Sequence, residues 1–255
     1  MEPIVGQALL PSYQWGLVIL SYVVSFFGSL MALQCAKLMY RKGGVLDRHL
    51  LICGAIALGG IGIWATHFIG MLAYRLAVPI GFDLILTLMS ILAAIAMSGI
   101  ALYVTNRGGK FRLFGWLAGS LLAGLGACVM HYMGMYAMNM RAMMSLDPGT
   151  VAISVAIAIG AAAAALWLAF NVTTLRHRIA AASVMGLAVC SMHYVGMAAA
   201  SMVCTAEAPA ISFRLSSTYL PGAVILVSGF VLLYMLWVIF DVDQDNHLGT
   251  DVRPT

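Results

Sequence analysis

Residues 131–137 read HYMGMYA, and they lie inside an apolar run that extends from about residue 113 to 138. Near-copies of this phrase stand at 67–73, as HFIGMLA, and at 193–199, as HYVGMAA. The histidines that open the three copies are His67, His131 and His193. An ionisable side chain within a long apolar stretch is costly, so each histidine is a candidate functional residue.

Each motif also carries a methionine four residues after its histidine: Met71, Met135 and Met197. Residues four apart on a helix lie one turn apart on the same face, so imidazole and thioether point the same way in all three copies. These donors suit copper or haem iron better than calcium or magnesium, which prefer oxygen. The motifs therefore predict a metal site formed by the three histidines and some of the methionines, with copper as the favoured cofactor and haem as the alternative.

The composition is that of a membrane protein. Of the 255 residues, 63% are hydrophobic and 9% are charged, whereas a soluble domain carries about 25% charged residues. Apolar runs long enough to cross a bilayer can be counted directly. We expect an all-α polytopic fold with seven transmembrane helices, at roughly 15–39, 50–74, 82–105, 113–138, 150–172, 179–203 and 219–240.

The distribution of basic residues predicts the orientation. Most Lys and Arg residues lie in the loops after the first, third and fifth runs, at 41–49, 107–112 and 176–178, whereas each alternate loop holds one. The positive-inside bias places the basic loops in the cytoplasm, the N-terminus outside and the C-terminus inside. The first run is too long for a signal-peptide core, so we expect it to be retained. These loops account for the net charge of +4, and nothing indicates nucleic-acid binding.

The motif histidines are spaced by 64 and then 62 residues, which indicates an internal repeat. We expect repeats at about 15–74, 82–138 and 150–203, each made of two helices and a basic hairpin loop, within a membrane domain of residues 1–245. A short cytoplasmic tail, 246–255, follows. Because two helices return the chain to the same side, the three motif helices run parallel. Their histidines then lie at similar depth in the outer half of the bilayer.

Further sulfur donors flank two of the histidines. Cys128 and Cys190 precede their histidines by three residues and share the same helix face, whereas the first copy has Trp64 there. Met130 and Met192 directly precede their histidines and are rotated about 100° away. We rank these four as secondary ligands. For the two cysteines, packing of small residues at a helix interface is a better explanation than ligation.

A glycine stands one position before each motif methionine, at Gly70, Gly134 and Gly196. Small residues let helices approach closely in lipid, so we expect these glycines to serve helix packing. The five cysteines are an odd number and four lie within expected helices, which argues against a disulfide framework.

The phrases MHYMGM at 130–135 and MHYVGM at 192–197, with the divergent THFIGM at 66–71, resemble the repeats of the MHYT domain. This family comprises bacterial membrane sensors with seven spans and three motifs, often fused to cytoplasmic domains that make and degrade cyclic di-GMP. The resemblance covers nearly the whole chain. It implies a copper site near the outer face of the bacterial inner membrane and the sensing of oxygen, carbon monoxide or nitric oxide. The threonine of the family name is missing from all three copies, which argues against a hydroxyl role there.

The sequence favours a sensor domain that signals through its seventh helix to a cytoplasmic partner. A copper or haem enzyme for oxygen or electron-transfer chemistry is the alternative, and a copper transporter is third. Both would need carboxylates within the membrane for a proton supply or relay. Asp83 is the only acidic residue within the expected helices before Asp241. The chain ends soon after the seventh helix, so it is either a stand-alone form or part of a longer protein.

Overall fold

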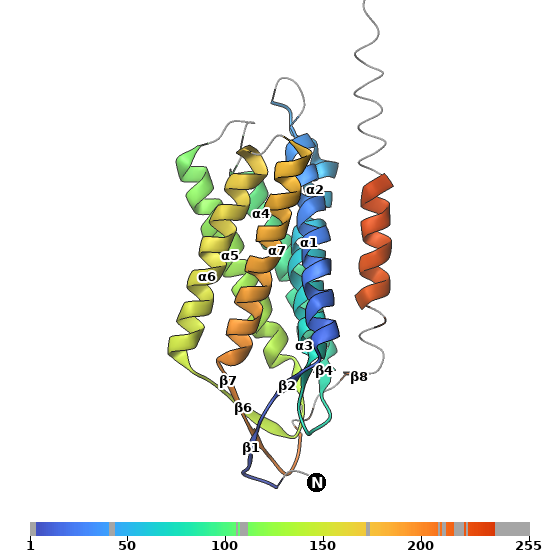
Figure 1. Cartoon of the computed structure of the whole chain (residues 1–255), viewed down its shortest axis with the longest axis vertical. Helices are drawn as coiled ribbons and strands as arrows, with labels where there is room; N and C mark the ends of the chain where they lie inside the picture. Colours follow the sequence, from blue (N-terminus) through green and yellow to red (C-terminus); the bar gives the residue numbers. More distant parts are fainter. Residues whose placement is uncertain are drawn as a thin grey trace, which may run out of the picture.

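The computed structural model describes residues 4–40, 44–105, 107, 112–171, 174–208, 210, 213–216, 222 and 224–237. Within these residues, six helices are long and apolar enough to cross a membrane. They are α1 (Trp15–Leu38), a continuous helix at Arg48–Ala73, α4 (Leu84–Thr105), α5 (Leu113–Tyr136), α6 (Pro148–Asn171) and α7 (Leu175–Ala198). The structure is mostly helical, which confirms the expected helical membrane fold in its main feature (Figure 1).

The second of these helices contains a segment that the sequence did not predict. It begins as α2 (Arg48–Ala55), continues as the π-helix η1 (Ile56–Ala65) and ends as α3 (Thr66–Ala73). A Cβ atom at Gly59 would overlap the carbonyl group of Ala94 on α4, so η1 and α4 pack backbone to backbone. π-Helical turns are rare and occur frequently at functional sites, and this one leads directly into the first motif.

The six helices form a ring. In order around it, α1 packs on η1, η1 on α4, α4 on α5, α5 on α6, α6 on α7, and α7 on α1. The motif-bearing helices α3, α5 and α7 also contact one another, and every residue of α3 is buried. By contrast, α6 exposes large apolar side chains such as Ile153 and Trp167. The ring thus presents an apolar surface suited to lipid and gathers the three motifs inside.

Eight short strands, counted over the residues that the structure describes, make the purely helical expectation incomplete. They are β1 (Ala8–Leu9), β2 (Ser12–Tyr13), β3 (Tyr74–Arg75), β4 (Gly81–Asp83), β5 (Met138–Asn139), β6 (Ala142–Leu146), β7 (Ala200–Cys204) and β8 (Arg214–Ser216). They form three antiparallel sheets, with strand orders β1-β7-β6, β2-β3 and β5-β4-β8. All three sheets lie beyond the ends of the motif helices (Figure 1), and we name this side the strand end and the other the basic-loop end.

The strands correct one expected span. The sixth run was expected to be helical over 179–203, but α7 extends from Leu175 to Ala198 and residues 200–204 form β7. The strand β7 pairs with both β1 and β6, which satisfies backbone groups that the helix end leaves free. Apolar composition alone does not distinguish the end of such a helix from a short buried strand.

The expected seventh span, 219–240, is described only in part. A shorter apolar helix occupies Val224–Trp237, coloured red in Figure 1. Its Val224 and Met235 side chains are buried, and the Tyr234 hydroxyl lies 3.5 Å from Nε2 of His49 at the start of the first motif helix. The rest of the expected span and the tail 246–255 lie outside the described residues.

Candidate metal centre

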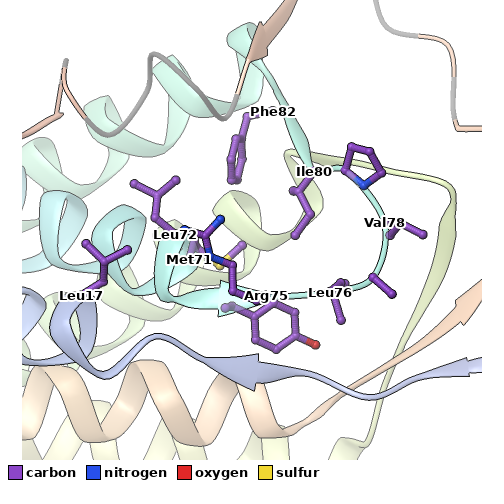
Figure 2. A pocket seen from close by; sticks show the side chains of 11 residues that line it. Leu17, Met71, Leu72, Arg75, Leu76, Val78, Ile80 and Phe82 are labelled. Carbon is purple, nitrogen blue, oxygen red and sulfur yellow. The ribbon is translucent and has the colours of Figure 1, made fainter. Parts of the chain in front are cut away.

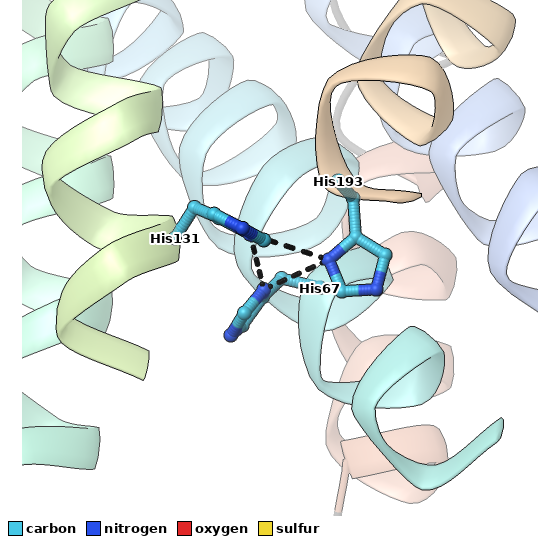
Figure 3. Close-up of side chains that lie close together, drawn as sticks. All are labelled: His67, His131 and His193. Atoms are coloured by element: carbon cyan, nitrogen blue, oxygen red, sulfur yellow. Dashed lines mark hydrogen bonds between the residues drawn. The ribbon is translucent and has the colours of Figure 1, made fainter. Parts of the chain in front are cut away.

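The motif histidines meet at the centre of the bundle, near the strand end. His67, His131 and His193 lie in the last two turns of α3, α5 and α7, and their exposed fractions are 1%, 0% and 1%. Figure 3 shows the three imidazoles turned toward one another from three different helices. Among the described His, Cys, Asp and Glu residues, these three form the group whose donor atoms lie within 4.8 Å of one another.

The Nδ1 atoms of the three imidazoles form a nearly equilateral triangle. The Nδ1 of His67 lies 3.0 Å from that of His131 and 3.0 Å from that of His193, and the remaining side is 3.3 Å. The centre of such a triangle lies about 1.8 Å from each corner, close to the ~2.0 Å of a metal–imidazole bond. Protonating all three Nδ1 atoms would aim three N–H groups at one another. The geometry therefore suits a shared metal ion.

The opposite edge of each imidazole rests on a motif glycine of another helix. A Cβ atom at Gly134 would overlap Nε2 of His67, and a Cβ at Gly196 would overlap Nε2 of His131. In the same way, Gly70 receives His193, which closes the cycle. The glycines were expected to serve helix packing, but what they accommodate is the histidine ring. This contact turns Nε2 away from the centre and Nδ1 toward it.

The three Nε2 atoms are buried and have no hydrogen-bond partner among the described residues. A buried polar atom without a partner is unusual and calls for an explanation, such as a bound ion or a functional role. Here the same feature recurs in all three motifs. The imidazole edge that carries Nε2 packs against the glycine of another helix, and the Nδ1 atoms converge on the other side.

The aromatic residue after each of two histidines is hydrogen-bonded to a neighbouring outer helix. The hydroxyl of Tyr132 lies 2.6 Å from that of Ser154 on α6, and the hydroxyl of Tyr194 lies 3.0 Å from that of Ser21 on α1. A hydrogen bond between hydroxyl groups in an apolar interface ties the two helices together. These bonds hold α5 against α6 and α7 against α1, and thus fix the helices that carry two of the histidines.

The divergent first motif reaches the same result with different residues. Phe68 has no hydroxyl group, but Trp64, one turn earlier, donates from Nε1 to the hydroxyl of Ser90 on α4 at 3.0 Å. The rings of Trp64 and Phe68 pack with their centroids 4.7 Å apart. Trp64 precedes its histidine by three residues, as Cys128 and Cys190 precede theirs. The two cysteines therefore lie on the helix face that is turned toward the neighbouring helix without a motif.

The motif methionines gather in one layer next to the histidines. Met71, Met135 and Met197 are all buried and belong to a single apolar cluster, which also contains Phe68 and Phe82. Because each methionine lies one turn after its histidine, this layer stands on the strand-end side of the imidazoles. The structure thus brings the three methionines together, beside the histidines.

The secondary candidates lie elsewhere. Cys128 and Met192 pack with Ala158 in a separate cluster, and Met130 belongs to the main core. The Sγ atom of Cys190 lies 3.9 Å from the hydroxyl of Ser21 on α1. Neither cysteine belongs to the group of donors that the histidines form within the described part of the chain.

A pocket of about 350 Å³ opens at the strand end, beside the methionine layer (Figure 2). Met71 and Phe82 line it together with Tyr74 and Arg75, and Arg75 donates a hydrogen bond of 2.8 Å to Gln14. Burial raises the pKa of Tyr74 to about 12, so its phenol stays protonated at neutral pH. The sequence did not reveal this pocket, because most of its walls come from residues 74–82, which follow the first motif and carry no motif of their own.

Comparison with protein families identifies three repeats. The family described as "MHYT: Bacterial signalling protein N terminal repeat" matches residues 60–115, 124–182 and 186–247. Each matched unit begins seven residues before a motif histidine. The matched units therefore start within a motif helix, whereas the repeats expected from the sequence end with one. Together the units cover more than half of the chain.

Curated relatives are signalling proteins. The bifunctional diguanylate cyclase/cyclic di-GMP phosphodiesterase MucR of Pseudomonas aeruginosa is 38% identical over 255 residues, 97% of this chain and 36% of the relative. The cyclic di-GMP phosphodiesterase NbdA of the same organism is 36% identical over 209 residues, 78% of this chain and 26% of the relative. The signalling protein YkoW of Bacillus subtilis is 29% identical over 74% of this chain and 24% of its own length. The chain thus spans little more than a third of these relatives at most. No solved structure matches it.

Proposed function

Because this chain belongs to the MHYT family of bacterial signalling proteins, we propose that it is the sensor domain of an inner-membrane signalling system. In this proposal, His67, His131 and His193 hold one copper ion through their Nδ1 atoms. The signal is a diatomic gas, namely oxygen, carbon monoxide or nitric oxide, or a change in the oxidation state of copper. The observation that carries the proposal is the buried triangle of three Nδ1 atoms.

Two features favour copper over haem. The imidazole centroids lie 4.9 to 5.2 Å apart, so the rings fill the space around the centre and leave none for a porphyrin. The neighbouring layer of thioethers also suits a soft ion, as copper(I) is. When bound, copper would supply a redox-active ion with affinity for diatomic gases. Metal analysis and optical spectra of protein purified without added metal test the proposal, and a haem Soret band would contradict it.

The histidines are well placed to transmit a signal because each belongs to a different helix. A change in the preferred arrangement of the three imidazoles would shift α3, α5 and α7 relative to one another. A signal requires a difference in binding free energy between two such arrangements. The helix that carries His67 also carries His49, which contacts Tyr234 of the terminal helix. This contact offers a route to a cytoplasmic partner, and the relatives suggest cyclic di-GMP turnover as the output.

We further propose seven spans, with the strand end outside the cell and the basic-loop end in the cytoplasm. The bias in Lys and Arg supports this orientation. Leu10 and Val45 lie at opposite ends and are 88% and 64% exposed, whereas all five native cysteines are buried. In intact cells, an impermeant thiol reagent should label Leu10→Cys and spare Val45→Cys. The opposite pattern would reverse the orientation.

The methionine layer leads to a prediction that separates ligands from packing residues. Changing Met71, Met135 and Met197 together to leucine preserves volume, at a cost usually below about 1.5 kcal/mol for each residue. If the thioethers are donors, copper(I) should bind more weakly while copper(II), held by the imidazoles, should lose less affinity. Competition with a copper(I) chelator measures the first effect.

Met89→Leu is the matched control, since Met89 is exposed on α4 and should not affect copper binding. If the triple variant binds both oxidation states as the parent does, the site consists of the three histidines with an apolar methionine lining.

A further inference from the structure

A second cavity, of about 50 Å³, lies inside the membrane-spanning part of the bundle. It is lined by η1, α5, α6 and α7, and its walls consist of leucine, isoleucine, valine, methionine and alanine side chains. The inner wall is formed by the buried Leu58 and Ile63 of η1. The outer wall contains half-buried alanines of α6, including Ala161, Ala162 and Ala165. The cavity thus extends from the lipid-facing helix toward the centre.

The inner part of the cavity lies near the histidine layer. Three of its wall residues, Ile63, Ala127 and Val189, each precede a motif histidine by four residues. Residues with this spacing lie about one turn apart on the same helix face. The cavity therefore stands one turn from the imidazoles on the basic-loop side. The methionine layer stands on the opposite side, so the two faces of the histidine layer differ.

The walls restrict what the cavity can hold. A buried water molecule needs two to four polar partners, and the side chains of these walls offer none. Sites for drug-sized ligands measure about 300–1,000 Å³, far more than this cavity provides. A cavity must measure about 10–15 Å³ to hold one water molecule. The volume of about 50 Å³ found here therefore has room for a diatomic molecule. Diatomic gases are apolar and dissolve readily in the hydrocarbon that surrounds α6.

We propose that this cavity binds an apolar diatomic gas and admits it from the bilayer to the histidine layer. The gas reaches the imidazoles from the basic-loop side, where no methionine layer intervenes. The role of the cavity in gas sensing rests on the proposed function. The binding of an apolar molecule in the cavity does not, because it needs no metal.

Xenon tests the cavity in metal-free protein in lipid nanodiscs, through the chemical shift of dissolved 129Xe. We expect saturable binding in the parent and its loss in Ala162→Leu, because the longer side chain fills the cavity. Ala188→Leu, which fills it from α7, should act in the same way and serves if the first variant does not fold. Ala164→Leu is the matched control on α6, since Ala164 is exposed and outside the cavity walls, and it should keep xenon binding.

Unchanged xenon binding in the folded, filled variants would overturn the proposal. Nuclear Overhauser contacts between lipid chains and the methyl groups of the cavity walls would also overturn it, if these contacts persist when xenon is added. Such contacts would show that an acyl chain occupies the cavity. In copper(I)-loaded protein, uptake of carbon monoxide should slow several-fold in Ala162→Leu, and an unchanged rate would exclude the access route. A protein that binds xenon here but no copper would refute the metal centre and leave the cavity assignment intact.

Discussion

Changing any one of His67, His131 and His193 to alanine is expected to abolish stable copper binding in the purified protein. Each imidazole supplies one corner of the Nδ1 triangle. Removing a residue that is hydrogen-bonded to a metal ligand already lowers metal affinity about 10–100-fold. Removing the ligand itself should lower metal affinity further. Copper content after dialysis, measured together with helicity by circular dichroism, is the test.

His49→Ala and His177→Ala are the matched controls, since both residues lie at the exposed basic-loop end. They should retain copper as the parent does. Full copper retention in all three motif variants, with the helical fold intact, would remove the proposed site.

Gly134→Ala should impair copper binding almost as strongly, although every donor remains in the chain. The added methyl group would overlap Nε2 of His67, so the imidazole must turn or α3 must move away from α5. Either change displaces one corner of the triangle. Overpacking of this kind also costs typically about 1–3 kcal/mol of stability. Gly70→Ala and Gly196→Ala should act alike, because each glycine receives one histidine.

Gly160→Ala on α6 provides the comparison. Nothing lies within 4 Å of a Cβ at Gly160, so this change should leave copper affinity unaltered. It should raise stability slightly, because alanine favours a helix over glycine by roughly 0.5–1 kcal/mol. A Gly134→Ala protein that loses stability but binds copper normally would show that the glycine serves helix packing alone.

The strand end illustrates where prediction from the sequence reaches its limit. The apolar runs located six helices to within a few residues, because hydropathy reports directly on what lipid tolerates. The same signal extended the sixth run into β7, which is apolar but pairs with β6. The π-helical segment η1 was also missed, as was its close backbone packing against α4, which involves a helix distant in sequence.

The sequence alone determined that this is a helical membrane protein with one motif repeated three times. It also determined that histidine, glycine and methionine share a helix face, because residue spacing sets angles along a single helix. The tertiary structure decided which atoms meet: the Nδ1 atoms converge, each Nε2 rests on a glycine of another helix, and Cys128 and Cys190 turn away. The physical reason is that such contacts depend on the relative rotation and depth of three helices. Packing between segments distant in sequence sets this rotation and this depth, so a local sequence pattern does not predict them.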